Sequence, residues 1–251
     1  MDLRETPAST VNRHPWELAR VTALRAIAQA YQLLPAAARV LDLGCGDGFI
    51  IDALCPEAMG SIEAVDIHLT GEQRTAFATA RPRITFHNSY HSLSGKQYGV
   101  ITLFDVLEHV EDDTAFLRET VARFAAPGAH LFCTVPAFPS LYCSHDAFLK
   151  HHRRYSLHDL QQVLRAAGLR VVASGYLFGM LLPARALTVL AERLLGAADA
   201  APGIGHWRHG RLLTSVIKAL LDADNYTLLW LGRRGITLPG LTVWTLCETP
   251  R

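Results

Sequence analysis

Short aliphatic runs alternate with amphipathic stretches from residue 39 to about residue 175. The runs predict strands and the stretches predict helices, and their alternation is typical of a parallel sheet wound with helices on both faces. The expected strands cover residues 39–43, 61–66, 83–87, 98–104, 129–135 and 169–175. The expected helices between them cover residues 48–56, 70–80, 112–125 and 156–167.

The elements outside this region are mostly helical. Residues 15–32 carry apolar side chains at helical spacing, and helical stretches at 179–197 and 211–233 precede a last strand at 241–247. We therefore expect a single domain over residues 1–251. Its parts are an N-terminal helical cover at 1–35, a core at 36–175, a helical insertion at 176–238 and the last strand within 239–251.

Composition narrows the class of protein. The chain has 251 residues, half of them hydrophobic, and a formal net charge of +1, which predicts a folded core and no nucleic-acid-binding surface. Its five cysteines form no C-x-x-C pair, so we expect reduced thiols rather than a structural zinc site. The N-terminal residues lack the basic and apolar regions of a signal peptide, which predicts a cytoplasmic location.

The most apolar stretch covers residues 176–198. Pro183, Arg185 and Glu192 interrupt it, so a transmembrane span is not expected. Its leucines lie near helical spacing beside basic residues, which fits either a helix at a membrane surface or a helix packed against the domain. Composition leaves open whether the insertion is a lid, a homodimer face or a pocket for an apolar substrate.

The strongest local signal is the segment VLDLGCGDGF at residues 40–49, an apolar strand that leads into a glycine turn and a helix. Glycines allow positive φ angles and let a ligand approach the main chain. Asp66 stands at the end of the next apolar run, where a carboxylate can accept hydrogen bonds from a ribose. Together these features predict a nucleoside site. The alternative is a tight strand-to-helix turn without a ligand.

The glycine spacing indicates which nucleoside this is. A pyrophosphate-binding turn has the pattern G-x-G-x-x-G, whereas Gly44, Gly46 and Gly48 follow G-x-G-x-G. Asp42 precedes them and would repel a pyrophosphate. The same carboxylate suits the ammonium group of S-adenosylmethionine, which carries no phosphate.

Together with the segment FDVLEHVEDD at residues 104–113, this turn resembles the class I methyltransferases. The second segment is similar to the DxLEH segment of a subgroup that includes ubiquinone-type and many small-molecule or glycan-pathway enzymes. The resemblance is clearest over residues 14–175. It implies an α/β fold with a doubly wound, seven-stranded, mostly parallel Rossmann-like sheet, an N-terminal helix and a helical insertion before the last strand.

The resemblance also implies the residues that surround S-adenosylmethionine. The strand-end acid and the glycine turn would hold the methionine part, Asp66 the ribose, and the tip of the fourth strand the methyl end. The family often has an acid after its third strand, where this chain has Asn88 and Ser89, so the adenine contact is expected to be altered. The full set is Asp42, Gly44, Cys45, Gly46, Asp66, Ile67, Asn88, Ser89, Phe104 and Asp105.

A second resemblance concerns the segments VPAF at residues 135–138, SHD at 144–146 and HHRRY at 151–155. They are similar to the loop after the fifth strand in bacterial methyltransferases found in envelope-polysaccharide gene neighbourhoods, which implies a glycan- or lipid-linked acceptor. The N-terminal helix matches one that covers the site in such enzymes. The acceptor contacts expected from this are Trp16, Arg20, His145, Arg153, Arg154 and Tyr155.

Methyl transfer needs a general base only when the acceptor arrives protonated. His109 is the first candidate, because it follows the fourth strand at the edge where ligands of α/β sheets bind and an imidazole pKa of about 6.5 suits proton transfer. The alternative is that His109 only makes local hydrogen bonds. His151 and His152 are further candidates, since they lie in the long loop after the fifth strand.

The charged residues of that loop allow two interpretations. Arg153 and Arg154 would bind an anionic acceptor, or they would pair with Asp146 or Asp159 and fix the loop. The histidines near Asp146 lack the compact spacing of a metal motif, so no metal site is expected.

The sequence thus predicts transfer of a methyl group from S-adenosylmethionine to a small-molecule or glycan- or lipid-linked acceptor. Two alternatives remain. One is an NAD(P)-dependent oxidoreductase on a similar fold, and the other is a non-catalytic protein that binds S-adenosylmethionine and recruits partners.

Overall fold

The computed structural model describes residues 13–35, 37–55, 61–93, 95–196, 207 and 209–250. Within them, seven strands form one sheet in the order β3-β2-β1-β4-β5-β7-β6. The first five strands are parallel, and β7 runs antiparallel between β5 and β6. The strands are Val40–Leu43 (β1), Ile62–Val65 (β2), Ile84–His87 (β3), Tyr98–Phe104 (β4), Ala125–Pro136 (β5), Arg170–Leu177 (β6) and Thr242–Glu248 (β7). The predicted seven-stranded, mostly parallel sheet is confirmed.

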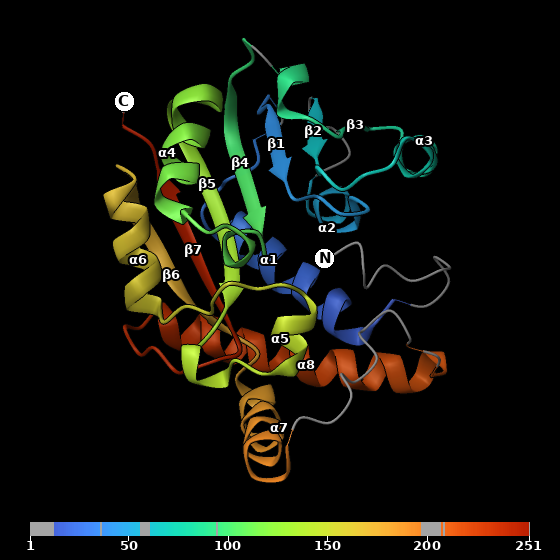
Figure 1. Ribbon diagram of the computed structural model, residues 1–251, viewed down its shortest axis with the longest axis vertical. Coiled ribbons are helices and arrows are strands. Elements are labelled where there is room, and N and C mark those ends of the chain that lie inside the picture. Colours follow the sequence, from blue (N-terminus) through green and yellow to red (C-terminus); the bar gives the residue numbers. More distant parts are fainter. Residues whose placement is uncertain are drawn as a thin grey trace.

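Helices cover both faces of this sheet (Figure 1). The α-helices are Pro15–Ala30 (α1), Phe49–Leu54 (α2), Gly71–Ala80 (α3), Asp113–Phe124 (α4), Ser144–Phe148 (α5), Leu157–Ala166 (α6), Leu182–Leu195 (α7) and Arg211–Gly232 (α8). Short 3₁₀ helices lie at Tyr90–Leu93 (η2), Leu107–His109 (η3), Pro139–Leu141 (η4) and Gly179–Leu181 (η5). The sequence pattern did not predict α5 or η3, and both contribute to the site.

Two hydrophobic cores hold the layers together. One core joins the sheet to α1, α2 and α8, and the other joins it to α4 and α6. Consecutive residues of β4 serve both, because side chains alternate along a strand: Leu103 belongs to the second core and Phe104 to the first. Phe104 packs edge-on against Phe132 at a ring-centroid distance of 5.2 Å.

The strand order changes direction at β1, which pairs with β2 on one side and β4 on the other. The segments that follow β1 and β4 therefore run to opposite faces of the sheet. In an open α/β sheet, such a switch point leaves a crevice beyond the carboxyl ends of the two strands. The glycine turn after β1 and the LEH segment after β4 both lie at this crevice.

The two helices of the insertion differ in their surroundings. Helix α8 lies against α1, and the Nζ of Lys218 donates to the Oγ1 of Thr22 at 3.1 Å. Helix α7 extends away from the body of the molecule (Figure 1). Its buried side chain is Val189, while Leu187, Leu190, Leu194 and Leu195 are exposed, so these leucines do not pack against the domain. Among the described residues, no helix has the length and hydropathy needed to cross a membrane.

Candidate active site

The turn after β1 has the backbone conformation that its glycines predict. Gly44 has a φ of 71°, and a Cβ added there would lie 2.5 Å from the Cγ2 of Val106. The amide of Gly44 donates to the carbonyl oxygen of Val65 at 2.8 Å, which ties the turn to the end of β2. Neither the backbone angle nor the space beside Val106 admits a larger residue at this position.

Asp66 connects this turn to the next strand end. Its Oδ2 accepts a hydrogen bond from the amide of Gly46 at 3.1 Å, and its Oδ1 accepts one from the amide of His68 at 2.9 Å. The carboxylate is only partly buried, so both oxygens keep room for further donors. Asp66 is therefore both a support of the glycine turn and a group that can accept hydrogen bonds from a ligand.

Asp42 lies beneath the turn and is buried. The Oγ1 of Thr102 donates to its Oδ1 at 2.6 Å. Burial raises the pKa of Asp42 to about 7, although the hydrogen bond from Thr102 favours the ionised form. Burial also raises the pKa of the neighbouring Cys45 thiol, so that side chain is an unreactive part of the turn.

A cavity of about 780 Å³ opens beside these groups. Four of the residues expected at the cofactor line it: Gly44, Asp66, Ile67 and Asp105. Its wall also includes residues that were not among the expected cofactor contacts, notably His68, Tyr90 and Val106. Other expected contacts lie elsewhere: Phe104 is in the core against Phe132, and Tyr90 rather than Asn88 or Ser89 lines the cavity after β3.

Asp105, at the end of β4, has a φ of 57°, which is uncommon for a residue other than glycine. The Nη1 of Arg20 lies 2.6 Å from its Oδ2, and the Oγ1 of Thr134 donates to its Oδ1 at 3.0 Å. Arg20 is fully buried and also donates to Thr134. Helix α1 is thereby joined to the tip of β4.

A second cavity, of about 310 Å³, lies next to the first. Its lining includes the expected acceptor contacts Trp16, Arg20, His145 and Arg154. The two cavities share Asp105, His109 and Leu149. A group bound in one would therefore meet a group bound in the other beside His109.

Asp146 organises the loop after β5 and is fully buried. The Nε of Arg154 and the Nδ1 of His151 lie 2.8 and 2.9 Å from its Oδ1. The Nη2 of Arg185 lies 2.7 Å from its Oδ2. Burial alone would raise the pKa of Asp146, but the hydrogen bond from His151 and the charges of both arginines outweigh it and hold the pKa well below its usual range. Asp146 is thus an ionised anchor for the loop.

The arginines and the tyrosine of the HHRRY segment contact the protein itself. Arg154 pairs with Asp146, which is one of the two interpretations that the sequence allowed for this residue. It also donates to the carbonyl oxygen of Ala137. Arg153 donates to the carbonyl oxygen of Glu111 and lies 3.4 Å from Asp113. Tyr155 is buried. Arg153 and Tyr155, expected to contact the acceptor, lie outside both cavity linings.

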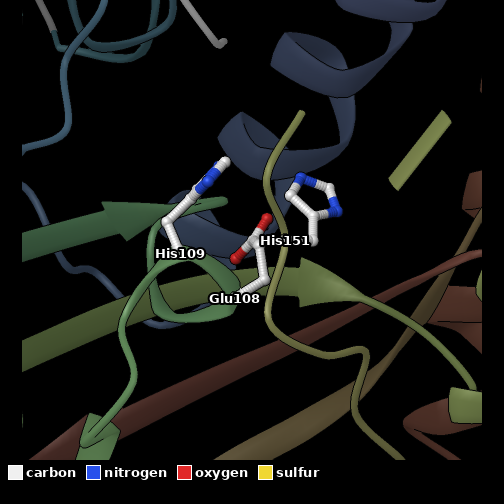
Figure 2. Close-up of side chains that lie close together, drawn as sticks. All are labelled: Glu108, His109 and His151. Carbon is white, nitrogen blue, oxygen red and sulfur yellow. The ribbon is translucent and has the colours of Figure 1, made fainter. Parts of the chain in front are cut away.

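The three histidines proposed for catalysis occupy different places. His109 lines both cavities, His151 lines the second and His152 lines the first. The rings of His109 and His151 meet edge-on at a centroid distance of 4.7 Å. Figure 2 shows the carboxylate of Glu108 beside both rings, and ligand-type atoms of all three side chains lie within 4.8 Å of one another. Burial and the charge of Asp105 raise the pKa of Glu108 well above its usual range.

Comparison with protein-family models matches residues 16–174 to a family described as "Methyltransferase domain". A ubiquinone biosynthesis O-methyltransferase from Xanthomonas axonopodis pv. citri (strain 306) is 32% identical over 107 residues, 40% of this chain and 44% of that protein. One from Vibrio vulnificus (strain YJ016) is 29% identical over 103 residues, 38% of this chain and 42% of that protein. The matched region thus spans less than half of the length of these relatives.

Solved structures share the fold across nearly the whole chain. The N-methyltransferase NodS from Bradyrhizobium japonicum WM9, in complex with S-adenosyl-L-homocysteine, aligns with a TM-score of 0.55 at 14% identity and covers 99% of this chain and 97% of its own. A SAM-dependent methyltransferase from Archaeoglobus fulgidus aligns with a TM-score of 0.52 at 17% identity, over 91% of this chain and 94% of its own. At these low sequence identities, the similarity shows a shared fold.

Proposed function

Since the chain belongs to the methyltransferase domain family, we propose that it transfers the methyl group of S-adenosylmethionine to a hydroxyl oxygen of a small-molecule acceptor. One observation carries this proposal: the cavity at the glycine turn and the cavity under α1 share His109 and Asp105. Methyl transfer is an in-line displacement, which requires donor and acceptor in adjoining spaces with their reacting atoms in contact.

The donor would occupy the larger cavity. Its ribose hydroxyls can donate to the carboxylate of Asp66, and Gly44, which has no side chain, lines the cavity where a ligand can approach the main chain. Asp42 supplies a negative charge for the ammonium group, directly or through water. The fold of NodS, which was solved with S-adenosyl-L-homocysteine, supports this assignment.

The acceptor would occupy the smaller cavity. Apolar walls from Trp16, Leu149 and Leu181 suit an apolar or ring-shaped body. Every arginine in the lining has a carboxylate partner, Asp105 for Arg20 and Asp146 for the other two, so the protein provides little excess charge for a strongly anionic acceptor. The relatives named as O-methyltransferases support oxygen as the methylated atom.

The bond changes are simple. The acceptor oxygen forms a bond to the methyl carbon, the carbon–sulfur bond breaks with its electron pair on sulfur, and the hydroxyl proton leaves. His109 and His151 are the groups placed to assist that loss of a proton, because both line the acceptor cavity. His152 lines the donor cavity instead, so we give it no part in this step.

The glycine spacing, the acid at Asp42 and the family match argue against an oxidoreductase. Calorimetry with S-adenosylhomocysteine and NADH, side by side, tests the assignment of the donor. We expect binding of the first ligand only, and a loss of about 5- to 150-fold in affinity in Asp66→Ala, since a ligand-facing hydrogen-bond partner contributes about 1–3 kcal/mol. Glu72→Ala, an exposed acid on α3, is the matched control. Tight NADH binding without adenosylhomocysteine binding would overturn the proposal.

Turnover needs its own test. The full-length protein would be incubated with methyl-labelled donor and a panel of hydroxylated aromatic, glycan and lipid-linked acceptors, followed by mass spectrometry of the products. We expect label on an oxygen atom of at least one class. Binding of the donor with no transfer to any class would favour the non-catalytic alternative.

A further inference from the structure

We propose that Glu108, His109 and His151 bind one divalent first-row metal ion, such as Zn²⁺ or Mn²⁺, at the wall of the acceptor cavity, and that the ion binds the oxygen to be methylated. The inference deepens the proposed function and rests on it. It assigns the substrate class as well: a hydroxylated acceptor that can bind a metal ion through oxygen.

The donor set and its geometry suit such an ion. Two imidazole nitrogens and one carboxylate oxygen form the facial arrangement that divalent first-row metals accept, with positions left for substrate or water. Metal–ligand bonds of about 2.0–2.2 Å place the ligand atoms of one ion about 3–4 Å apart. The three side chains bring their ligand atoms within 4.8 Å of one another, so small rotations close the site (Figure 2).

Glu108 provides an independent observation. Its side chain is buried, with 1% of its surface exposed, and its Oε2 has no hydrogen-bond partner among the described residues. A buried carboxylate oxygen without a partner carries a desolvation cost that native proteins rarely leave uncompensated. A bound cation would compensate it.

His151 is held in the manner of a metal ligand. Its Nδ1 lies 2.9 Å from the Oδ1 of Asp146, which directs the other ring nitrogen away from that carboxylate. Metal-binding histidines usually donate their second ring nitrogen to a carboxylate or carbonyl, which fixes the ring and raises its basicity. Asp146 is itself held by Arg154, Arg185 and the amide of Cys143.

The two segments that supply the ligands are joined by the backbone. The amide of His152 donates to the carbonyl oxygen of Glu108 at 2.7 Å. The hydroxyl of Tyr155 donates to the carbonyl oxygen of Leu107 at 3.1 Å and to Asp113 at 2.8 Å. The chain that follows His151 is thus attached at two points to η3 and its neighbours, so the position of the cluster is fixed by hydrogen bonds between the two segments.

The arginines that line the cavity are already paired with carboxylates other than Glu108. Arg20 pairs with Asp105, and Arg154 and Arg185 pair with Asp146. A divalent ion would add two positive charges next to the acceptor, which favours an ionised oxygen. With His109 and His151 bound to the ion, they would assist proton loss through the ion and not as bases. The acceptor hydroxyl would release its proton to water, its oxygen would bond to the methyl carbon, and the sulfur would keep the electrons of the broken bond.

Metal binding can be measured without donor or acceptor. Full-length, tag-free protein would be stripped with EDTA, desalted and titrated with Zn²⁺ or Mn²⁺ by calorimetry, with elemental analysis of the product. We expect one ion per chain, at least tenfold weaker binding in Glu108→Gln and His151→Ala, and about 10- to 100-fold weaker binding in Asp146→Asn. His152→Ala, in the same loop but outside the cluster, should retain the ion. Equal binding by His151→Ala and His152→Ala, or no ion in the unmodified protein, would overturn the proposal.

Activity separates this proposal from the one that it rests on. With an acceptor identified, we expect EDTA-treated protein to lose at least tenfold in turnover, to recover with Zn²⁺ or Mn²⁺, and to bind S-adenosylhomocysteine as before. Full turnover without metal would overturn the proposed metal site but would still support methyl transfer. Ion binding without any adenosylhomocysteine binding would leave a metal site but remove the proposed function.

Discussion

The Nη2 of Arg185 on α7 donates to the Oδ2 of Asp146 on α5 at 2.7 Å. On the same helix, Glu192 accepts a hydrogen bond from the hydroxyl of Ser144 at 2.7 Å. The helical insertion is therefore attached to the short helix whose acid orients His151. A change in the position of α7 would alter this ion pair and, through Asp146, the position of His151 in the acceptor cavity. The ion pair is therefore a physical link between the insertion and the proposed catalytic site.

Replacing Arg185 should show this link. In Arg185→Met, Asp146 loses one of its two guanidinium partners, and the position of His151 becomes less defined. We expect turnover to fall by about tenfold or more, as for other groups that orient a functional histidine, while affinity for S-adenosylhomocysteine stays unchanged. Steady-state kinetics with calorimetry measures both quantities.

Arg193→Met is the matched control for that variant. Arg193 is on the same helix but donates to the carbonyl oxygen of Ser140 rather than to Asp146. We expect its turnover to stay close to that of the unmodified protein. Equal losses in the two variants would mean that the helix supports the loop only in a general way, without a specific role for the pair with Asp146.

The raised pKa of Asp42, about 7, predicts a pH dependence of donor binding. An ammonium group needs the ionised carboxylate, so the affinity for S-adenosylhomocysteine should be about tenfold weaker at pH 6 than at pH 8.

The free energy of unfolding of the unliganded protein should change with pH in the opposite sense. The folded-state pKa lies above the ordinary value of 3.8, so the folded state holds the extra proton between about pH 4 and pH 7 and stability falls as pH rises through that range.

Asp42→Asn provides the control for both effects. The amide cannot ionise, so binding of S-adenosylhomocysteine should be weak and flat between pH 6 and pH 8, and the slope of stability with pH should diminish. Calorimetry and denaturant unfolding at a series of pH values measure them. A variant that kept the slope in affinity would assign the titration to another group.

How far the sequence leads depends on how local each feature is. The turn at Gly44 and the carboxylate of Asp66 were predictable, because backbone angles and strand ends are set within a few residues. The cluster of Glu108, His109 and His151 was not. Its ligands come from η3 and from a loop more than forty residues later, and their contact depends on the hydrogen bond between the amide of His152 and the carbonyl of Glu108.

The same reasoning applies to the two arginines of the HHRRY segment. In sequence, Arg153 and Arg154 look equivalent, and either fits an anionic ligand. In the fold they diverge, with Arg154 paired to Asp146 and Arg153 bonded to the carbonyl of Glu111. Which partner an arginine finds is a tertiary property that spacing along the chain does not encode.

Gly44→Ala tests the turn directly. Its Cβ would come within 2.5 Å of Val106 in a backbone conformation that L residues rarely adopt, so we expect loss of stability of about 1–3 kcal/mol and loss of adenosylhomocysteine affinity. Gly71→Ala is the control, because no atom lies within 4 Å of a Cβ added there. At the first position of α3 it should be neutral or slightly stabilising. Denaturant unfolding compares the two, and similar behaviour of both variants would contradict the role given to Gly44.

Arg20→Met tests the cover formed by α1. Arg20 is fully buried and reaches both Asp105 and Thr134, so its removal leaves the carboxylate at the tip of β4 with one donor fewer and releases α1 from the sheet edge. Asp105 is partly exposed and water can hydrate it, so we expect the free energy of unfolding to fall by about 1–3 kcal/mol rather than by the full cost of a buried charge without a partner.

Turnover should fall more than affinity for S-adenosylhomocysteine, because Arg20 lines the acceptor cavity and not the donor cavity. Arg25→Met, an exposed position on the same helix, should stay within about 0.5 kcal/mol of the unmodified protein. Equal stability losses in the two variants would show that the pair of Arg20 with Asp105 does not anchor the helix.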